Sequence, residues 1–423
     1  MSSTQKLGVY VATDPTRVGD LHYTTDGPRE FSKFVYNPAW MASPTGFPIA
    51  PHMPFSIAEY YNSKNRDGGI CFPSPVQDAC PDSWGRDLIR KSLGRYCTEF
   101  DYLTEINDLT RQGALRFKLE GDSRYVSFKD HEIPRINRVT DIRAVIEEIE
   151  RNPDVGSEKL RGVAGSGLGG ARPKSDVIDD DGSLWLAKYT SVLDTKPVER
   201  AEAGTLLLGK KVGINTAHFQ LEGKHGPLPV TLLRRFDRDA RGGRRHYISG
   251  QTMLGSDMAV GHSYLDLLEA MGTFSMDFRR DARELFRRVA YTILLSNHDD
   301  HMKNHGFLMQ DRDNHWRLSP MFDVNPQPER AAHLETAIAP GSSNEASLEL
   351  LFDNAAFFAW EVDEAVTMVH HMAQIIRDQW RPIMEMMGMS GSECRYYARA
   401  IEHDQMDYAL KERYAVVGFS PEP

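Results

Sequence analysis

The segment Ser296–His305 holds the densest set of side chains in this sequence that could do chemistry, and it reads SNHDDHMKNH. Asp299 and Asn304 are five residues apart, and Asp323 follows after one predicted hairpin. Phosphoryl transfer requires a carboxylate near the acceptor hydroxyl, together with an amide and a second carboxylate that hold Mg²⁺. The order helix, loop, hairpin and aspartate is that of a kinase catalytic loop, and it favours phosphoryl transfer.

The same segment has a second interpretation as the metal site of a hydrolase. Imidazole and carboxylate groups suit transition metals, and the candidate ligands are His298, Asp299, Asp300, His301 and His305. Such a site needs further ligands from elsewhere in the chain. His262 and the pair His370–His371 are candidates, although no spacing rule ties them to the segment and such histidines are more often surface or satisfied core residues.

A glycine-rich segment, Gly165–Gly170, matches the pattern GxGxxG. A dinucleotide-binding fold uses this pattern between a strand and a helix, whereas a kinase uses it as a cover over ATP phosphates. Here Pro173 disfavours a following helix, and Asp179–Gly182 is a hairpin-type turn before the apolar strand Leu184–Tyr189, which carries Lys188. This order favours the kinase arrangement, and the plain alternative is a flexible surface loop.

Lys188 lies near the end of an apolar strand, where a lysine is unexpected without an anionic partner. A predicted helix that opens at Pro197 and runs to Val212 offers Glu202 as that partner. Taken alone, Glu202 would more often be a solvated helix residue. A lysine that grips ATP phosphates and is held by a helix glutamate is nevertheless a requirement of kinases.

The short predicted strand Thr231–Arg238 lies between the strand-rich lobe that precedes it and the helix-rich lobe that follows it. An adenine would pair with backbone groups at such a hinge between lobes. The most basic run of the sequence begins there, with arginines at 234, 235, 238, 241, 244 and 245. Such a run is either a solvated loop or a contact for phosphate or nucleic acid.

Length, charge and cysteine content limit the class of protein that carries these residues. A chain of 423 residues suggests about two or three domains. A formal charge of −10 argues against nonspecific coating of nucleic acid. Four cysteines without a CxxC pair argue against a thiolate zinc site or a disulfide framework. The sequence shows neither a signal peptide nor a membrane-spanning run, so we expect a cytoplasmic protein.

The first 110 or so residues predict a small α+β or β-rich domain, with strands at Leu7–Thr13 and Lys33–Tyr36 and a helix near Trp84–Leu93. A helix is expected at Ile142–Arg151, capped by Asp141, and a domain boundary near residues 125–160. The pattern of residues 160–250 predicts strands and one helix. Helices dominate after about residue 255, and the tail segments with helical periodicity are Ala346–Leu351, Ala355–Trp380 and Glu393–Ile401.

Assembled, these residues resemble the HipA family, the serine/threonine-kinase toxins of bacterial toxin–antitoxin modules, over nearly the full length. FVYNPAW at Phe34–Trp40 and PDSWGR at Pro81–Arg86 look like that family's first subdomain.

The remaining motifs carry the resemblance into the rest of the chain. Gly169–Lys174 resembles the family's phosphate loop, and Leu186–Lys188 resembles its ATP-binding strand. Arg235–Arg238 resembles the hinge, Asn297–Asn304 the catalytic loop, and Phe322–Val324 occupies the metal-binding position. The catalytic loop and the hinge are the specific motifs, and the glycines are supporting evidence.

The resemblance implies an α+β protein with a two-lobed, protein-kinase-like fold, a small β-rich amino-terminal subdomain and an all-helical carboxy-terminal lobe. The implied domains are the amino-terminal subdomain at residues 1–125, a kinase N-lobe-like region at 126–250 and the helical C-lobe at 251–423.

The resemblance also implies ATP- and Mg²⁺-dependent phosphorylation of Ser or Thr in a protein substrate, as members phosphorylate aminoacyl-tRNA synthetases. Asp299 would be the catalytic base, and Asn304 and Asp323 would bind the metal. The implied nucleotide-binding residues are Gly167, Gly169, Gly170, Lys174, Lys188, Glu202, Arg235, Phe236, Asp237, His301 and Lys303.

Family members typically pair with a small helix-turn-helix antitoxin of the HipB type, which supplies most of the operator DNA binding. Some members phosphorylate a serine of their own glycine loop. This sequence has Gly167 where that serine often stands, which leaves the adjacent Ser166 as the candidate. It also has Arg234 where an acidic hinge residue is common.

Two other function classes remain open at this point. One is a kinase-like body that binds an antitoxin and DNA without phosphoryl transfer, and the other is the metal-dependent hydrolase. The intact set Lys188, Asp299, Asn304 and Asp323 favours an active kinase over the first.

Overall fold

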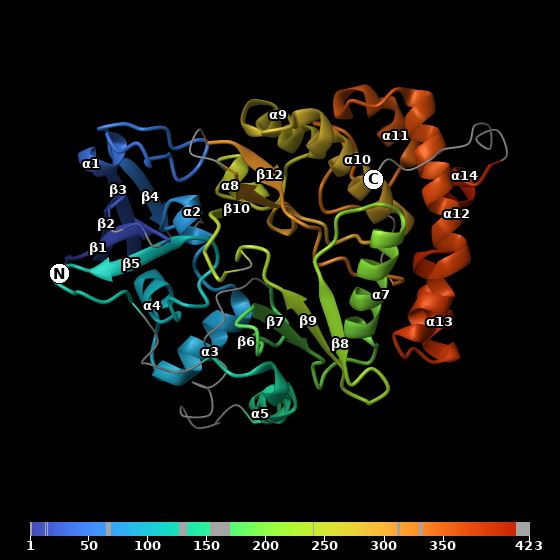
Figure 1. The fold of residues 1–423 in the computed structure, drawn as a ribbon, viewed down its shortest axis with the longest axis horizontal. Helices are drawn as coiled ribbons and strands as arrows, with labels where there is room; N and C mark the ends of the chain where they lie inside the picture. The colour runs from blue at the N-terminus through green and yellow to red at the C-terminus, as the bar shows by residue number, and fades with distance from the viewer. Residues whose placement is uncertain are drawn as a thin grey trace. The chain divides into compact units, whose positions relative to one another are not determined.

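The computed structural model describes residues 2–12, 14, 16–64, 69–126, 133–152, 170–239, 241–310, 314–329 and 333–411 (Figure 1). The chain divides into two compact units, and each unit combines segments that are distant in sequence. The first comprises Met1–Leu193, Leu232–Met258 and Phe307–Trp316, and the second Asp194–Thr231, Ala259–Gly306 and Arg317–Pro423. None of the helices in the described ranges is long and apolar enough to cross a membrane.

The amino-terminal part of the first unit is built on a five-stranded sheet of order β4-β3-β2-β1-β5. Its described pairs are antiparallel, with Leu7 of β1 opposite Leu21 of β2 and Val9 opposite Phe117 of β5. The strands are β1 (Ser3–Val11), β2 (Gly19–Asp26), β3 (Arg29–Tyr36), β4 (Tyr60–Lys64) and β5 (Leu115–Leu119). The expected strands at Leu7–Thr13 and Lys33–Tyr36 therefore exist and extend further towards their amino ends.

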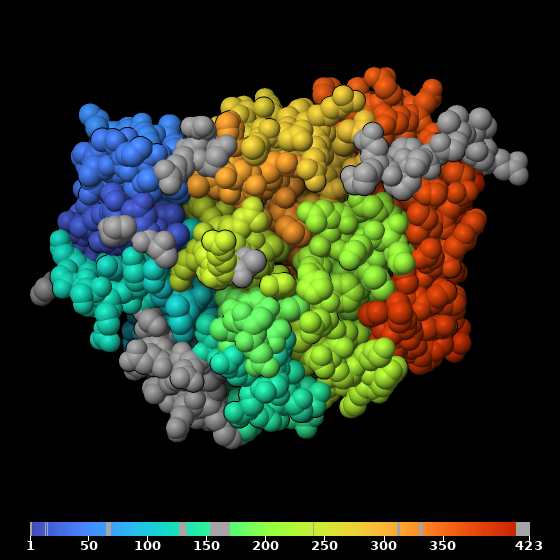
Figure 2. Space-filling view, viewed as in Figure 1, coloured from blue at the N-terminus to red at the C-terminus, as the bar shows by residue number. Residues whose placement is uncertain are grey.

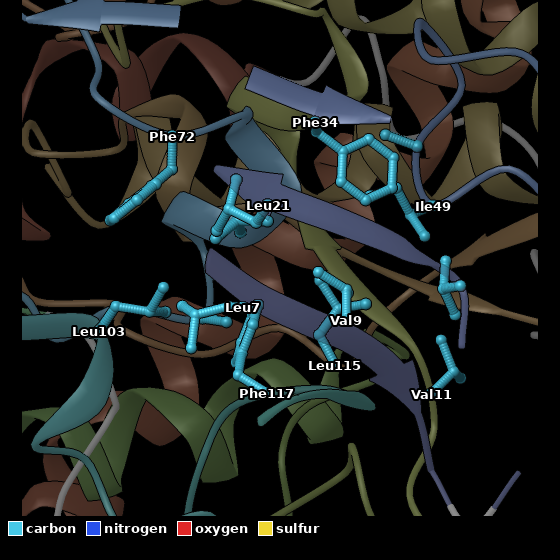
Figure 3. Close-up of a cluster of buried hydrophobic side chains, with 14 of the residues drawn as sticks. Leu7, Val9, Val11, Leu21, Phe34, Ile49, Phe72, Leu103, Leu115 and Phe117 are labelled. Atoms are coloured by element: carbon cyan, nitrogen blue, oxygen red, sulfur yellow. The ribbon is translucent and has the colours of Figure 1, made fainter. Parts of the chain in front are cut away.

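One face of this sheet forms a hydrophobic core, which Figure 3 shows in close-up. Alternate residues of the strands point into it because side chains alternate between the two faces of a sheet. Leu103, from a short helix, closes the core together with Phe72. The helices of this unit are α1 (Pro38–Met41), α2 (Ser74–Gln77), α3 (Ser83–Leu93), α4 (Glu99–Thr104), η1 (Ile136–Arg138), α5 (Val139–Arg151) and α8 (Gly250–Met253).

Two smaller sheets follow. One has the order β6-β7-β9-β8, with β6 (Lys174–Ile178), β7 (Leu184–Tyr189), β9 (Val230–Arg234) and β8 (Phe219–Glu222). β6 and β7 form the predicted antiparallel hairpin, and Gly182 in its turn has a φ of 82°. The other sheet has the order β10-β11-β12, with β10 (Tyr247–Ser249), β11 (Gly306–Met309) and β12 (Trp316–Leu318).

Helices dominate the second unit. They are α7 (Val198–Lys211), α9 (Tyr264–Phe274), α10 (Phe278–Leu294), η2 (Met302–Asn304), α11 (Leu348–Asp353), η3 (Ala355–Phe358), α12 (Val362–Met386), α13 (Gly391–Tyr397), η4 (Ala398–Ala400) and α14 (Asp404–Ala409). α7 packs on α12 at Gly204, where a Cβ would lie 2.5 Å from the sulfur of Met384. In the space-filling view α12 and α13 form one continuous orange-to-red surface (Figure 2).

Two helix predictions need correction. The helix α5 begins at Val139, so Asp141 lies in its first turn and not at its cap; a carboxylate there still interacts favourably with the helix dipole. The predicted helix Ala355–Trp380 is broken, because Ala359 adopts a left-handed φ of 60° after η3 and α12 begins only at Val362. The carboxy-terminal region is also not entirely helical, since it contains the hairpin of β11 and β12 that the local sequence indicated.

Candidate active site

Helix α10 delivers the candidate catalytic loop within the second unit. Its apolar residues Leu285, Phe286, Val289 and Ile293 are buried, which anchors the helix in the core. The helix ends at Leu294, and Ser296 then adopts a left-handed φ of 51°. The chain therefore turns sharply at the first residue of the loop, and the amide of Asn297 still donates to Thr292 O at 3.0 Å.

The two adjacent aspartates of the loop have opposite environments. Asp299 is exposed, and among the described residues its carboxylate makes no hydrogen bond or ion pair, whereas Asp300 is buried. The carbonyl of Asp299 accepts from the amide of His301 at 3.1 Å and from Asn304 Nδ2 at 3.0 Å. The backbone of Asp299 is thus fixed while its carboxylate remains available to a substrate.

Asp300 anchors the loop from inside. Its Oδ2 accepts a hydrogen bond from Tyr264 at 2.7 Å, and its carbonyl accepts one from Thr336 at 2.6 Å. His305 Nε2 lies 3.3 Å from the same Oδ2. Burial alone would raise the pKa of the Asp300 carboxyl, but His305 and the hydrogen bond from Tyr264 outweigh it and hold the pKa below its usual range.

These contacts bear on the metal-ligand interpretation. Asp300 and His305 contact each other inside the protein, and His370 Nδ1 contacts Ala409 O at 2.8 Å. Within the described ranges, no three His, Cys, Asp or Glu side chains gather in a group that could hold a metal ion. The contacts of Asp300 and His305 therefore support a structural role for these two residues.

Asn304 and Asp323 offer the kind of ligands that Mg²⁺ prefers. Because Asn304 Nδ2 donates to Asp299 O, its remaining polar atom is the carbonyl Oδ1, and Asp323 supplies a carboxylate. Mg²⁺ is bound through oxygen ligands, usually one or two carboxylates with water and phosphate. The donor set of these two residues therefore fits the expected metal, and both belong to the second unit.

Asp323 is held in an unusual backbone conformation, with a φ of 58°. Such a conformation persists in a non-glycine residue only where its surroundings enforce it. On one side, the amide of Met321 donates to Asn215 O at 2.7 Å. On the other, Thr205 Oγ1 of α7 donates to Val324 O at 2.8 Å. The segment that carries Asp323 is therefore tied to two other parts of the same unit.

His301 and Lys303 are half-buried in the loop that Met302 anchors. Met302 is fully buried, and its amide donates to Ala259 O at 3.1 Å. This anchoring fixes the backbone that presents His301 and Lys303, and their nucleotide role stays a prediction.

The candidate phosphate-binding residues lie in the first unit. Gly167, Gly169 and Ser166 fall outside the described residues. Gly170 has a φ of 104°, and a Cβ there would lie 2.6 Å from Lys174 Nζ, so the lysine ammonium packs directly against this glycine. Trp84 fixes the strand from α3, since its Nε1 donates to Lys174 O at 3.1 Å. Lys174 is buried at the start of β6.

The predicted lysine–glutamate pair consists of residues from different units. Lys188 lies in β7, exactly the strand expected, and is 8% exposed. Glu202 lies in α7 and is 2% exposed, so it is not the solvated helix residue that the sequence alone would suggest. Both are buried polar residues with partners, and their pairing with each other stays a prediction.

The side chains of the predicted hinge form a buried ion-pair network. Arg235 contacts Asp176 Oδ1 at 2.8 Å and Asp237 Oδ2 at 2.6 Å, and Asp237 also accepts from Arg238 and from the amide of Gly113. Burial alone would raise the pKa of the Asp237 carboxyl, but the two guanidinium groups hold it well below its usual range.

This network changes the interpretation of the basic run. Arg244 likewise contacts Asp108, and Arg234 lies 3.7 Å from Asp181. Phe236 lies against Tyr247 with 6.1 Å between ring centroids. The arginines at 235, 238 and 244 are therefore structural ion-pair partners. The nucleotide role assigned to Arg235, Phe236 and Asp237 stays a prediction.

Sequence reasoning did not identify Tyr264, Thr336 or Asn325 as part of this region. Tyr264 and Thr336 are both 36 residues from Asp300, so no local spacing connects them to the loop. Asn325 is two residues after Asp323 and donates to its carboxylate from Nδ2 at 3.0 Å, and this proximity was the one available signal.

Two family models match this chain. The family model described as the HipA-like C-terminal domain matches residues 166–380, and the model of the HipA N-terminal domain matches residues 9–117. A protein of Haemophilus influenzae that is named only provisionally as a kinase is 25% identical over 189 residues, 39% of this chain. The match spans about half, 54%, of that relative's length.

Among solved structures, the chain is similar to HipA of Shewanella oneidensis MR-1, from its complex with HipB and operator DNA. The TM-score is 0.68 at 18% identity, and the match covers 97% of each chain. This likeness shows the fold, which is mixed α+β and kinase-like. Because the C-terminal family model alone covers half of the sequence, the chain belongs to the HipA family.

Proposed function

We propose that this chain is a toxin kinase that transfers the γ-phosphate of ATP to a Ser or Thr of a protein substrate. The observation that carries the proposal is the exposed carboxylate of Asp299, whose backbone is fixed by Asn304 while the neighbouring Asp300 anchors the loop. Membership of the HipA family supports it.

The roles of the side chains follow from their environments. Asp299 accepts the proton of the substrate hydroxyl while the hydroxyl oxygen forms a bond to the γ-phosphorus of ATP. The bond between the γ-phosphorus and the oxygen that bridges it to the β-phosphate breaks, and ADP is released. Asn304 and Asp323 would hold the metal. Bound Mg²⁺ would neutralise the charge that develops on the phosphate oxygens. Positioning and electrostatic stabilisation, which these rigidly held residues provide, account for most of the catalysis in this reaction class.

The nucleotide would be held by the residues of the glycine loop together with Lys174, Lys188 and Glu202. The hinge residues Arg235–Asp237 would contribute backbone contacts, and His301 and Lys303 would contact phosphates. Ser166 is the candidate for autophosphorylation. The proposed domains are residues 1–125, 126–250 and 251–423.

The proposed partners follow from family membership and from the solved relative. That relative was determined with HipB and its operator DNA. We assign to this chain a HipB-like antitoxin, with DNA contacted mainly through the antitoxin. The proposed substrate is a translation factor such as an aminoacyl-tRNA synthetase.

The test compares Asp299→Asn with a matched surface variant, Asp378→Asn, in an assay of phosphate transfer from labelled ATP to protein. Asp378 is exposed on α12, and the one ion pair it makes with a described residue is with its neighbour Arg377 at 3.0 Å. General-base catalysis contributes about 10²–10⁴-fold, so we expect Asp299→Asn to lose transfer by that factor and Asp378→Asn to keep it. Full transfer by Asp299→Asn would contradict the proposal.

A further inference from the structure

Asn325 connects the candidate metal ligand Asp323 to the catalytic loop. Its Nδ2 donates to Asp323 Oδ1 at 3.0 Å, and its backbone amide donates to Asn297 Oδ1, also at 3.0 Å. Asn297 is 2% exposed and opens the catalytic loop. One residue thus contacts both the carboxylate that would bind the metal and the loop that carries the catalytic base.

A second hydrogen bond joins the same two segments. The amide of Gln327 donates to Ser296 O at 3.0 Å. Ser296 and Asp323 both have left-handed φ angles, of 51° and 58°. The hydrogen bonds of Asn325 and Gln327 join the segment after Asp323 to the segment that begins at Ser296. These contacts hold both left-handed residues in place, as such conformations require.

The other polar atom of the Asn325 side chain has no partner among the residues that the structure describes. Asn325 Oδ1 is fully buried and accepts no hydrogen bond from any residue that the structure describes. A buried acceptor without a partner is costly, at about 1–3 kcal/mol. That this cost is tolerated indicates that the contact of Nδ2 with the Asp323 carboxylate holds the amide in place.

We infer that Asn325 is a positioning residue for Asp323: its Nδ2 orients the carboxylate, and its backbone amide ties this segment to Asn297 of the catalytic loop. This inference rests on the proposed function, because it assigns Asp323 to the metal. Hydrogen bonds to a ligating carboxylate fix its orientation, and losing such an outer contact typically weakens metal binding about 10–100-fold. Asn325 does not touch the reacting atoms and is not a catalytic residue.

The experiment measures Mn²⁺ binding in the presence of saturating AMPPNP, with free Mn²⁺ followed by electron paramagnetic resonance. The variants are Asn325→Ala, the milder Asn325→Ser and the control Asn354→Ala. Asn354 is a half-buried asparagine of the same unit that donates from Nδ2 to Leu350 O at 2.8 Å. It therefore loses a comparable hydrogen bond away from the site.

We expect the Mn²⁺ dissociation constant to rise about 10–100-fold in Asn325→Ala, to rise less in Asn325→Ser and to stay unchanged in Asn354→Ala. AMPPNP binding in EDTA should be equal in all four proteins, which separates a metal effect from a general structural one. If Asn325→Ala does not fold, Asn325→Ser decides. Wild-type affinity in the folded Asn325 variants would overturn the inference and leave the kinase proposal standing. Failure of the wild type to bind Mn²⁺ with AMPPNP would overturn both.

Discussion

At the scale of single residues, the catalytic loop separates two carboxylates that are adjacent in sequence. Asp299 is exposed and its carboxylate has no partner among the described residues, while Asp300 is buried between Tyr264, His305 and Thr336. One carboxylate therefore stays exposed to solvent while the next one fixes the backbone of the loop. The two aspartates should therefore respond differently to the same substitution.

Replacement of Asp300 by Asn should lower the free energy of unfolding, by about 1–3 kcal/mol, because it removes a charged acceptor from a buried hydrogen bond. The pKa of Asp300 is lower in the folded protein than its usual value. Its contribution is therefore complete above the unfolded pKa of about 4 and is lost as the pH falls through the folded pKa.

Urea unfolding at pH 7 and at pH 3.5 checks this expectation, with Asp299→Asn as the control because its carboxylate is exposed. The difference between wild type and Asp300→Asn should be larger at pH 7. An Asp300→Asn protein as stable as the wild type at pH 7 would show that the anchor contributes nothing.

At the scale of elements, buried arginines join the end of β9 to the loop that precedes β5. Arg235 donates to Thr110 O at 3.0 Å and to Asp176 Oδ1 in β6 at 2.8 Å. Arg238 donates to Arg111 O at 2.8 Å, and Asp237 accepts from the amide of Gly113. The hinge-like segment is therefore built into the first unit by backbone and ionic contacts together.

Substitution Asp237→Asn should destabilise the protein by about 3–5 kcal/mol, because removing one partner of a buried pair leaves uncompensated charge. The control is Asp180→Asn, whose side chain is 92% exposed and lies 3.9 Å from Arg135. Exposed pairs contribute about 0–1 kcal/mol, so this variant should unfold like the wild type. Thermal denaturation followed by circular dichroism compares the three proteins, and equal melting temperatures for all of them would refute a structural role for Asp237.

At the scale of the whole molecule, histidines whose pKa is lowered by full or partial burial make stability depend on pH in both units. His246 Nε2 donates to Ile49 O at 2.8 Å, and its ring lies 5.4 Å from that of Trp316 between centroids. Burial lowers the pKa of His246 to about 4. Partial burial also lowers the pKa of His403, which is half-buried in the second unit. In each case the unfolded chain takes up a proton more readily than the folded one.

Stability should therefore be complete above the unfolded pKa of about 6.5 and fall as the pH drops towards 4, where folded His246 begins to titrate. For His246 alone the loss amounts to about 3 kcal/mol over that range. The variant His246→Gln keeps a side-chain donor for Ile49 O and cannot titrate, so its unfolding free energy should fall less between pH 7 and pH 4.5. A pH dependence identical to that of the wild type would exclude His246 as a source.

The sequence by itself determined the family, most element positions and the order of the candidate catalytic residues, because these depend on local pattern and on spacing along the chain. β7 occupies the predicted range Leu184–Tyr189, and Asp299, Asn304 and Asp323 follow a helix, a loop and a hairpin as expected. Three features are visible only in the tertiary structure. Asp300 and not Asp299 is buried, Arg235 forms buried ion pairs, and Asn325 contacts both Asp323 and Asn297. Burial and ion pairing depend on residues from distant parts of the chain, such as Tyr264 and Thr336. The local sequence pattern around Asp300 therefore cannot predict these contacts.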